Sequence, residues 1–468
     1  MSSFSLRVFK GRAYSPVWAG RPGIVTAKRS ELGGEMNTLS AKSQAAKAFV
    51  AAIALFFLAI SGAAAETSYV RAGRLVDVEK GAVLKDQLIR IEDGRITSVS
   101  TFVGAPADGP LTDWSAYMVL PGLMDMHTHL IGGIQNHIAD PLTTTGAEDV
   151  LVGADNARKT LKAGFTTVRD VGAWRALTDV ALRDAINNGY VPGPRMAVAG
   201  GYLTVPGGGG AITGLADDVG IPADMTRGII ANVDDAREKA RYFLQHHVDW
   251  LKFIATGAVL TLGTDPGAPE LSEEEMRAAV EEAKRYGKFA TAHAHGAEGA
   301  KMAIRAGVRS IEHGSLLDDE ALKMMKSRGV WLVADIYNGD YINEIGARDG
   351  WPEETMQKNR DTTDTQREVF RKAVKMGVKI AYGTDSGVYP HGDNANQFPY
   401  MVKYGMTPMQ AIQSATISSA TLLGWEKDIG AVSPGHYADM VAIDGDAIAN
   451  IEDIKKVHAV MKSGEIVK

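Results

Sequence analysis

PGLMDMHTHL, residues 121–130, is the stretch of the sequence that reveals most about the fold. Its apolar residues, among them Leu123 and Met126, are typical of a buried β-strand. Successive side chains of a strand point to opposite faces, so His127 and His129 share one face. Two imidazoles on one face of a buried strand can bind one metal ion. A His-x-His pattern alone is a weak signal, however, so a metal site needs further ligands elsewhere in the chain.

Short apolar strands alternate with amphipathic helices after this first strand. We expect strands at residues 122–129, 165–171, 195–202, 249–255, 289–295, 310–313, 330–337 and 379–384. Helices are expected between them, for example at residues 149–163, 234–247, 272–286, 318–327 and 353–376. Ser272 followed by Glu275 is a capping box at the start of one of them. This alternation predicts the α/β class and a (β/α)8 TIM-like barrel over residues 121–429. The alternative is a doubly wound open sheet, but no glycine-rich phosphate-binding turn opens the first unit.

Two β-rich segments flank the predicted barrel. Residues 66–120 contain alternating apolar positions and turn residues such as Asp93-Gly94. Residues 430–468 again indicate a strand, a turn and a strand. Each segment is too small to bury a core by itself. We therefore expect the two chain ends to form one small β-sandwich domain together.

Residues 1–65 are expected to be a leader. An apolar run, AFVAAIALFFLAI, follows basic residues and precedes SGAAA, which is typical of a signal peptide cleaved after Ala65. Its h-region and cleavage site occupy residues 48–65, and the apolar run is short for a membrane span. We expect a periplasmic or secreted protein with no stable membrane insertion after cleavage; an uncleaved anchor is the alternative. Both Met1 and Met36 remain candidates for the start of translation.

The composition excludes several kinds of site. The 468 residues contain no cysteine, which rules out disulfides, thiolate zinc sites and a cysteine nucleophile. A metal ion would therefore need His, Asp, Glu or a modified Lys as ligands. The net charge of −6 gives no electrostatic case for nucleic acid, so we expect no nucleic-acid partner.

Residues of metal-binding type recur at the ends of the later strands. They are His293 and His295 in KFATAHAHG, His313 in RSIEHG and Asp385 in IAYGTDSG. Barrel enzymes place their catalytic groups at the carboxyl ends of the strands. We therefore expect these side chains to meet the two histidines of the first strand at one site.

Lys252 lies within the apolar strand VDWLKFIATG. A free ammonium there is costly unless it is paired or neutralised. One interpretation is an ion pair with a carboxylate. The other is reaction with CO2 to form a carbamate, an anionic group that can bridge two cations. Burial favours the neutral amine that carbamylation needs.

Together these motifs resemble the metal-dependent amidohydrolase superfamily, over essentially all of residues 66–468. The phrases GFTTVRDVG, AHAHGAEG, SIEHG and ATISSATLLG are similar to those of its prolidase-like and imidazolonepropionase-related members. That group includes Xaa-Pro dipeptidases, other dipeptidases and enzymes that cleave N-acyl amino acids such as ochratoxin A. A β-sandwich built from both chain ends is also a trait of the superfamily.

The resemblance implies a centre of two divalent ions, whose six ligands would be His127, His129, Lys252, His293, His313 and Asp385. The first two histidines and Asp385 would hold the more buried ion, and the other two histidines the second. Carbamylated Lys252 would bridge both ions. Zn2+ is the expected metal, although the ligands also suit Mn2+ and Co2+. His293 resembles the family's ligand more than His295 does, and the choice between them stays open.

The expected reaction is hydrolysis of an amide bond, in a dipeptide of the Xaa-Pro kind or in an ochratoxin-like N-acyl amino acid. A hydroxide that bridges the metal ions would attack the carbonyl, and Asp385 would pass its proton to the leaving amine. One alternative is a mononuclear cyclic-amide hydrolase of the imidazolonepropionase type, against which Lys252 argues. Another is a non-catalytic barrel scaffold, against which the complete set of ligands argues.

The sequence predicts the contacts with this small peptide-like substrate less well than it predicts the metal ligands. Candidates at strand ends or in neighbouring loops are His137, Arg169, Tyr202, His295 and Tyr337. A positioned cation or phenol can bind a substrate carboxylate. For Arg169 the alternative is a structural ion pair, for example with Asp170. The sequence leaves open whether the protein forms a homo-oligomer.

Overall fold

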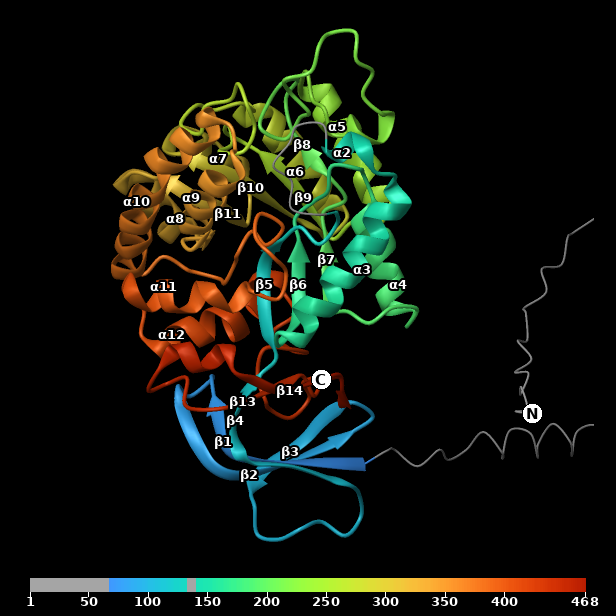
Figure 1. Ribbon diagram of the computed structural model, residues 1–468, viewed down its shortest axis with the longest axis vertical. Coiled ribbons are helices and arrows are strands. Elements are labelled where there is room, and N and C mark those ends of the chain that lie inside the picture. The colour runs from blue at the N-terminus through green and yellow to red at the C-terminus, as the bar shows by residue number, and fades with distance from the viewer. Residues whose placement is uncertain (1–66, 133–139) are drawn as a thin grey trace, which may run out of the picture. The chain divides into compact units, whose positions relative to one another are not determined.

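The computed structural model describes residues 67–132 and 140–468, and parallel strands lie at its centre (Figure 1). A three-stranded sheet contains β5 (Leu123–Thr128), β6 (Phe165–Asp170) and β7 (Arg195–Val198). A five-stranded sheet contains β8 (Tyr202–Leu203), β9 (Trp250–Ile254), β10 (Phe289–Gly296), β11 (Ser310–Leu316) and β12 (Trp331–Val333). Neighbouring strands in both sheets are parallel.

Backbone contacts close these two sheets into a barrel. The amide of Asp249 donates to the carbonyl of Val198 over 2.8 Å, which joins β7 to the start of β9. On the other side, single parallel bridges join β12 to Ile380 and β5 to Ser386. The segment that contains Ile380 and Ser386 therefore lies between the last strand and the first. The predicted α/β class and (β/α)8 barrel are confirmed.

Some predicted strands are shorter than their apolar patterns suggested. The strand expected at residues 330–337 ends at Val333, because the chain turns toward helix α9 (Asn338–Asp349). In that turn the Asn338 amide donates to the Asp335 carbonyl over 3.0 Å. The strand expected at residues 379–384 forms a single bridge, between Ile380 and Leu332. These are the places where the chain leaves the barrel wall next to the site described below.

Helices lie around the strands of the barrel (Figure 1). The longer ones are α3 (Gly146–Lys162), α4 (Thr178–Asn187), α5 (Val233–Gln245), α6 (Glu273–Arg285), α7 (Ala297–Ala306), α8 (Asp319–Arg328) and α10 (Glu353–Met376). Shorter ones are α2 (Asp140–Thr143), α11 (Gln397–Lys403), α12 (Pro408–Gln413) and α13 (Ser419–Leu423). The predicted capping box of Ser272 and Glu275 begins α6. Apolar side chains on one face of α6, such as Met276 and Ala283, belong to the main hydrophobic core.

Both ends of the described chain contribute to one seven-stranded sheet of order β15-β14-β13-β4-β1-β2-β3. Its strands are β1 (Thr67–Asp77), β2 (Ala82–Glu92), β3 (Arg95–Thr101), β4 (Leu111–Pro121), β13 (Met440–Ile443), β14 (Val457–Lys462) and β15 (Glu465–Ile466). The Ile96 amide of β3 donates to the His436 carbonyl over 2.9 Å, just before β13, so the sheet folds back on itself. Its core combines Val70, Ile89 and Met440. The predicted sandwich of both chain ends is confirmed, while its boundaries at 66–120 and 430–468 stay a prediction.

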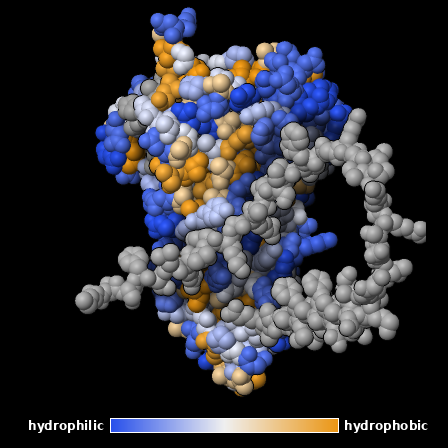
Figure 2. Space-filling model, turned by 90° about the vertical axis from the view of Figure 1, so that its right-hand side faces the viewer, coloured by the Kyte–Doolittle hydropathy of each residue, from blue (hydrophilic) through white to orange (hydrophobic). Residues whose placement is uncertain are grey.

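The surface is mixed in character. Figure 2 shows a face on which hydrophobic side chains gather in the upper part among hydrophilic ones. Leu151 and Val152 of α3 are exposed by 71% and 42%. Within residues 67–132 and 140–468, no helix combines the length and the apolarity needed to cross a membrane. The question of a homo-oligomer stays open, and the predicted leader lies outside the described residues.

Candidate active site

A cavity of about 360 Å³ lies at the carboxyl ends of the barrel strands. The structure brings together in its wall all six residues predicted as ligands: His127, His129, Lys252, His293, His313 and Asp385. They come from β5 and the residues just after it, from β9, β10 and β11, and from the segment that follows the bridge at Ile380. The barrel therefore brings together strand ends that are far apart in the chain, as expected from the sequence.

The side chains form two groups that can hold a metal ion. His127, His313 and Asp385 offer ligand atoms that all lie within 4.8 Å of one another. The same limit of 4.8 Å applies to His293, His295 and His313. His313 belongs to both groups, so the two candidate ion positions are adjacent.

The Nδ1 atoms of three of the cavity histidines contact a protein group. These contacts are His127 to Glu312 Oε2 at 2.9 Å, His313 to Asp335 Oδ1 at 3.0 Å, and His129 to Gly172 O at 2.8 Å. A partner at Nδ1 leaves Nε2 for a metal ion. The Nε2 atoms of His127 and His129 lie 3.4 and 3.3 Å from Asp385 Oδ1. The rings are therefore oriented for metal binding by the protein itself.

His293 and His295 are held in opposite ways. His293 Nε2 lies 3.2 Å from Gly257 O, which leaves Nδ1. His295 Nδ1 lies 2.8 Å from Ser315 Oγ, which leaves Nε2. Within the described part of the chain each ring thus has one nitrogen without a hydrogen-bond partner, and both residues line the cavity. The choice of His293 over His295 as the ligand of β10 stays a prediction.

Burial favours the neutral form of three of these imidazoles, whereas for His129 the contact with Asp385 outweighs burial and raises the pKa. Burial lowers the pKa of His127 and of His293 well below the usual value, and it lowers the pKa of His295 to about 3. The neighbouring Lys252 lowers the pKa of His127 further, and the neighbouring His313 lowers that of His293. Neutral imidazole is the form that binds metal, so the donor set fits divalent ions.

Lys252 is buried and, among the described residues, forms no ion pair. Burial lowers its pKa to about 8, although the nearby carboxylates of Glu312 and Asp385 act in the opposite direction. An unpaired buried ammonium between histidines is unfavourable. The ion-pair interpretation of Lys252 therefore finds no support in the described contacts.

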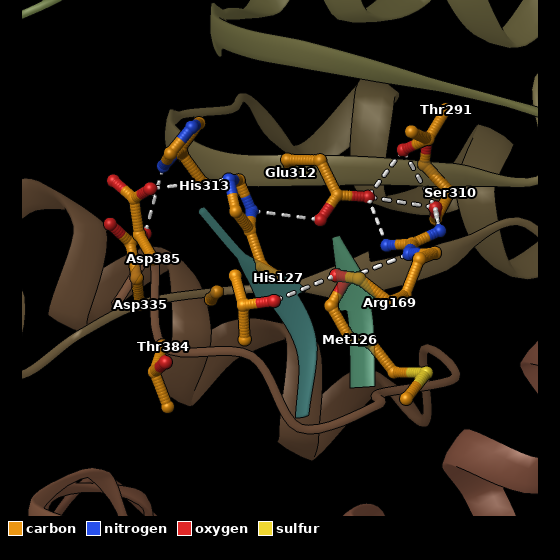
Figure 3. A network of polar contacts seen from close by, with 12 residues as sticks. Met126, His127, Arg169, Thr291, Ser310, Glu312, His313, Asp335, Thr384 and Asp385 are labelled. Atoms are coloured by element: carbon orange, nitrogen blue, oxygen red, sulfur yellow. Dashed lines mark hydrogen bonds and ion pairs between the residues drawn. The ribbon is translucent and has the colours of Figure 1, made fainter. Parts of the chain in front are cut away.

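Arg169, a predicted substrate contact, does not line the cavity. Figure 3 shows its guanidinium turned toward Glu312, Ser310 and Met126 instead. It donates to Glu312 Oε1 over 2.7 Å, to Ser310 Oγ over 2.9 Å and to the Met126 carbonyl over 2.7 Å. Both Arg169 and Glu312 are fully buried. The ion pair is with Glu312, not with Asp170, and Arg169 joins three barrel strands.

Two of the other predicted substrate contacts, Tyr202 and His295, line the cavity. The Tyr202 hydroxyl lies 3.2 Å from His129 Nδ1 and from Gly172 O. Tyr337 does not line the cavity; its ring packs against Tyr389 and Tyr400 with centroids 5.1 and 5.3 Å apart. His137 lies outside the described residues.

Four buried polar residues around the centre were not singled out from the sequence: Glu312, Asp335, Asn338 and Gln366. The carboxylate of Asp335 accepts from Gln366 Nε2 over 2.7 Å and from Asn338 Nδ2 over 3.1 Å, besides contacting His313. Glu312 lies in the same SIEHG segment as His313, where a charged residue inside an apolar strand was a usable signal. Asp335 and Asn338 follow a strand end, which was the only signal they carried.

The rest of the cavity wall is mostly apolar. Its larger members include Ile131, Trp174, Ile254, Leu260, Ile342 and Trp351. Among the described lining residues, Lys252 is the only Lys or Arg. Apolar side chains therefore supply most of the surface of this wall.

The fold and the site define a class, the barrel hydrolases whose active sites are built for divalent metal ions. The amidohydrolase family matches residues 118–467, and the chain belongs to this family. The protein is thus an enzyme that acts on C–N bonds.

Three similar proteins show which members of the family this chain resembles. The solved structure of a Xaa-Pro dipeptidase with methionine in its active site is 36% identical, with a TM-score of 0.81 and coverage of 86% of this chain and 99% of that chain. Ochratoxinase of Aspergillus niger is 30% identical over 434 residues, which cover 86% of this chain and 87% of the relative. Imidazolonepropionase of Streptomyces coelicolor is 23% identical over 394 residues, 77% of this chain and 86% of the relative. The predicted resemblance to prolidase-like and imidazolonepropionase-related amidohydrolases is confirmed.

Proposed function

We propose that the protein is a binuclear metal-dependent amidohydrolase that cleaves dipeptides of the Xaa-Pro kind or N-acyl amino acids. The observation that carries this proposal is the pair of donor groups that share His313. A mononuclear site needs one such group. The second group, with Lys252 in the same cavity wall, supports two adjacent ions.

The residues that would hold the ions are those predicted from the sequence. His127, His129 and Asp385 would surround one ion position, and His293 and His313 the other, which the short distances among these side chains support. Bound divalent ions, Zn2+ by the chemistry of these donors, would supply an activated water and polarise the scissile carbonyl.

Lys252 would act as a carbamate. An ammonium cannot be a metal ligand, and a buried ammonium among neutral histidines is unfavourable. Reaction of the neutral amine with CO2 forms an N–C bond, releases one proton and leaves an anionic group with two oxygen atoms. Such a group can contact both ion positions, as a glutamate would.

Asp385 would carry the proton of the reaction. Its Oδ1 lies beside the Nε2 atoms of His127 and His129, and its Oδ2 accepts from Asn338 Nδ2 over 3.2 Å. A carboxylate at this point can take a proton from the attacking water and pass it to the leaving nitrogen. The leaving nitrogen would then depart as a neutral amine and not as a strongly basic amide anion.

The substrate class rests on the relatives and on the cavity wall. One similar structure is that of a Xaa-Pro dipeptidase, and another similar protein is an ochratoxinase. The apolar residues of the wall suit an aromatic or aliphatic side chain of a dipeptide or an apolar acyl group. Tyr202 and His295 are the polar groups that would orient it.

A hydrolysis panel tests this proposal. Purified enzyme with added Zn2+ is assayed against Xaa-Pro dipeptides, other dipeptides, N-acyl-phenylalanines and a cyclic amide. We expect turnover in at least one of the first three classes and a loss of kcat by about a hundredfold or more in Asp385→Asn, which also excludes a contaminating hydrolase. Turnover of the cyclic amide alone would instead favour the imidazolonepropionase type.

Export is part of the proposal as well. The apolar run before Ala65 supports a periplasmic or secreted location. Amino-terminal sequencing of the protein from the extracytoplasmic fraction is expected to begin at Glu66. Recovery of the uncleaved chain in the cytoplasm would contradict export.

A further inference from the structure

Asp125, two residues before His127, carries a buried carboxylate that the proposed reaction does not use. It is fully buried, does not line the cavity and forms no ion pair among the described residues. A buried carboxylate without a cation is unfavourable unless hydrogen bonds compensate for its lost hydration. Asp125 accepts such bonds from the Thr384 hydroxyl, from Asn394 Nδ2 over 2.7 Å and from the His127 amide over 3.1 Å. All of these partners are donors, so a carboxylate fits at this position where a carboxamide would not.

The side-chain donors belong to the chain segment on both sides of Asp385. Thr384 comes directly before Asp385 in this segment (Figure 3). Its Oγ1 accepts from the amide of Ser386, the residue directly after Asp385, over 3.1 Å. Asn394 Nδ2 donates to Ser386 Oγ over 3.1 Å as well as to Asp125. One connected set of hydrogen bonds thus fastens the residues before and after Asp385 to Asp125.

Asp385 needs such support because of its backbone conformation. Its φ angle of 57° lies in the left-handed region. Residues other than glycine adopt this region at a cost in free energy, and they keep it only where the surroundings hold them. Asp385 lines the cavity, whereas Asp125, Thr384 and Ser386 do not. These three residues therefore hold Asp385 from the side that faces away from the cavity.

The same contacts tie Asp385 to the strand of the two predicted ligands His127 and His129. Asp125 lies in β5, and the Asp385 amide donates to the His127 carbonyl over 2.8 Å. Asp385 Oδ1 lies 3.4 Å from His127 Nε2 and 3.3 Å from His129 Nε2. A shift of the Asp385 backbone would change both distances. A misplacement of about 1 Å in a reacting group can lower the rate about a hundredfold.

We infer that Asp125 is a positioning residue for Asp385. Through Thr384 and Asn394 it holds Asp385 in the conformation in which the carboxylate faces the two histidines of the PGLMDMHTHL stretch. This inference rests on the proposed function, in which Asp385 binds one metal ion and carries the proton. A residue that orients a metal ligand affects both the affinity for the metal and the turnover.

The test removes the hydroxyl of Thr384, which links Asp125 to the residues around Asp385. Thr384→Val keeps the shape of the side chain, and Thr384→Ser keeps the hydroxyl. With saturating Zn2+ and the substrate that gives the highest kcat/KM in the hydrolysis panel, we expect kcat to fall about tenfold in Thr384→Val. KM is expected to stay within about twofold of the wild type, because Asp385 acts in the transition state. Thr384→Ser is expected to keep kcat within about twofold of the wild type.

Zn2+ affinity is the second measurement, and it needs no substrate. Competition with a chelator is expected to show binding about tenfold weaker in Thr384→Val and near the wild type in Thr384→Ser. Thr416→Val is the control, since it removes another buried hydroxyl, which donates to the Ile412 carbonyl over 2.8 Å and does not line the cavity. Its kcat and its Zn2+ affinity are expected to equal those of the wild type.

A purely structural role of the hydroxyl is tested in an Asp385→Asn background. There Thr384→Val is expected to lower kcat by less than about twofold, because the group that it positions is already lost. Equal losses of kcat in both backgrounds would overturn the inference, and so would a Thr384→Val variant with the kcat and the Zn2+ affinity of the wild type. Either result, with a large loss of kcat in Asp385→Asn, would leave the proposed function intact.

Two further outcomes are separate from these. Full turnover in Asp385→Asn would count against the proposed function itself. Asp125→Asn keeps the shape of the side chain but turns an NH2 group toward a donor, and it replaces Thr384→Val if that variant does not fold. The same losses of kcat and of Zn2+ affinity are expected from it, and wild-type values would overturn the inference.

Discussion

Two residues at the centre of the cavity have an unusual backbone. His313 and Asp385 have φ angles of 66° and 57°, in the left-handed region that residues other than glycine rarely adopt. Each such conformation costs on the order of 1–3 kcal/mol and persists only where the surroundings hold it. Asp335 and Asn338 hold the side chains of these two residues. Strain at both positions supports their assignment to the functional centre.

The candidate metal ligands could be predicted from single residues of the sequence, but the protein groups that contact these ligands could not. His127, Lys252 and Asp385 are of metal-binding type within apolar strands, which is visible in the sequence. The contact of His127 with Glu312 joins β5 to β11, and no local pattern reports a contact between distant strands. Arg169 illustrates the same limit, since its position at a strand end was compatible with both a substrate contact and an ion pair.

Replacing Arg169 tests the structural role that the structure gives it. Arg169→Met leaves the Glu312 carboxylate buried without its cation, and we expect the free energy of unfolding to fall by about 3 kcal/mol. Urea denaturation measures this change, and KM of the folded enzyme is expected to stay near that of the wild type. Unchanged stability with a strongly raised KM would instead indicate that Arg169 contacts the substrate.

Element boundaries follow local chemistry where a cap is present and tertiary contacts where it is not. Helix α10 begins and ends at the predicted residues 353 and 376, since Gly377 in the left-handed region terminates it. The strand expected at residues 330–337 was wrong after Val333, although Ile336 and Tyr337 are residues that favour strands. The turn that ends β12 carries Asp335 and Asn338 into the cavity wall, and this requirement overrides the β-propensity of the segment.

The cap of α6 provides a test at the scale of one element. The Ser272 hydroxyl accepts from the Glu275 amide over 3.2 Å, and Glu275 returns the contact in a capping box. We expect Ser272→Ala to lower the free energy of unfolding by about 1 kcal/mol, because one helix amide loses its partner. Ser327→Ala, at the exposed last turn of α8, is the control and is expected to change stability by less than about 0.5 kcal/mol. Equal effects of the two substitutions would count against the cap.

Contacts between the terminal sheet and the barrel unite the described chain. Asp439, just before β13, accepts from Arg195 of β7 over 2.7 Å, and Lys462 of β14 donates to the Gly193 carbonyl over 2.7 Å. The sequence indicated that both chain ends belong to one small domain. It could not indicate that this domain rests on the start of β7, because such contacts depend on the whole barrel.

Lys462 gives this junction a pH dependence. Burial, and then the nearby Arg195, lower its pKa to about 8, from an ordinary value of 10.5. The unfolded chain therefore binds more protons between these pH values, so this lysine makes stability rise with pH there, and its favourable contribution is lost as the pH falls to 8. The free energy of unfolding of the wild type minus that of Lys462→Met is expected to rise from pH 8 to pH 10, by on the order of 2 kcal/mol. Denaturant titrations at these pH values measure it, and a difference that does not depend on pH would contradict the assignment.

The central claim is a centre of two metal ions bridged by carbamylated Lys252, and counting the ions tests it most directly. Protein produced with Zn2+ and bicarbonate is freed of loosely bound metal and analysed by mass spectrometry of its metal content. We expect close to two ions per chain in the wild type and clearly fewer in Lys252→Ala, with folding of both checked by circular dichroism. A value near one ion per chain in the wild type, unchanged in Lys252→Ala, would contradict the claim.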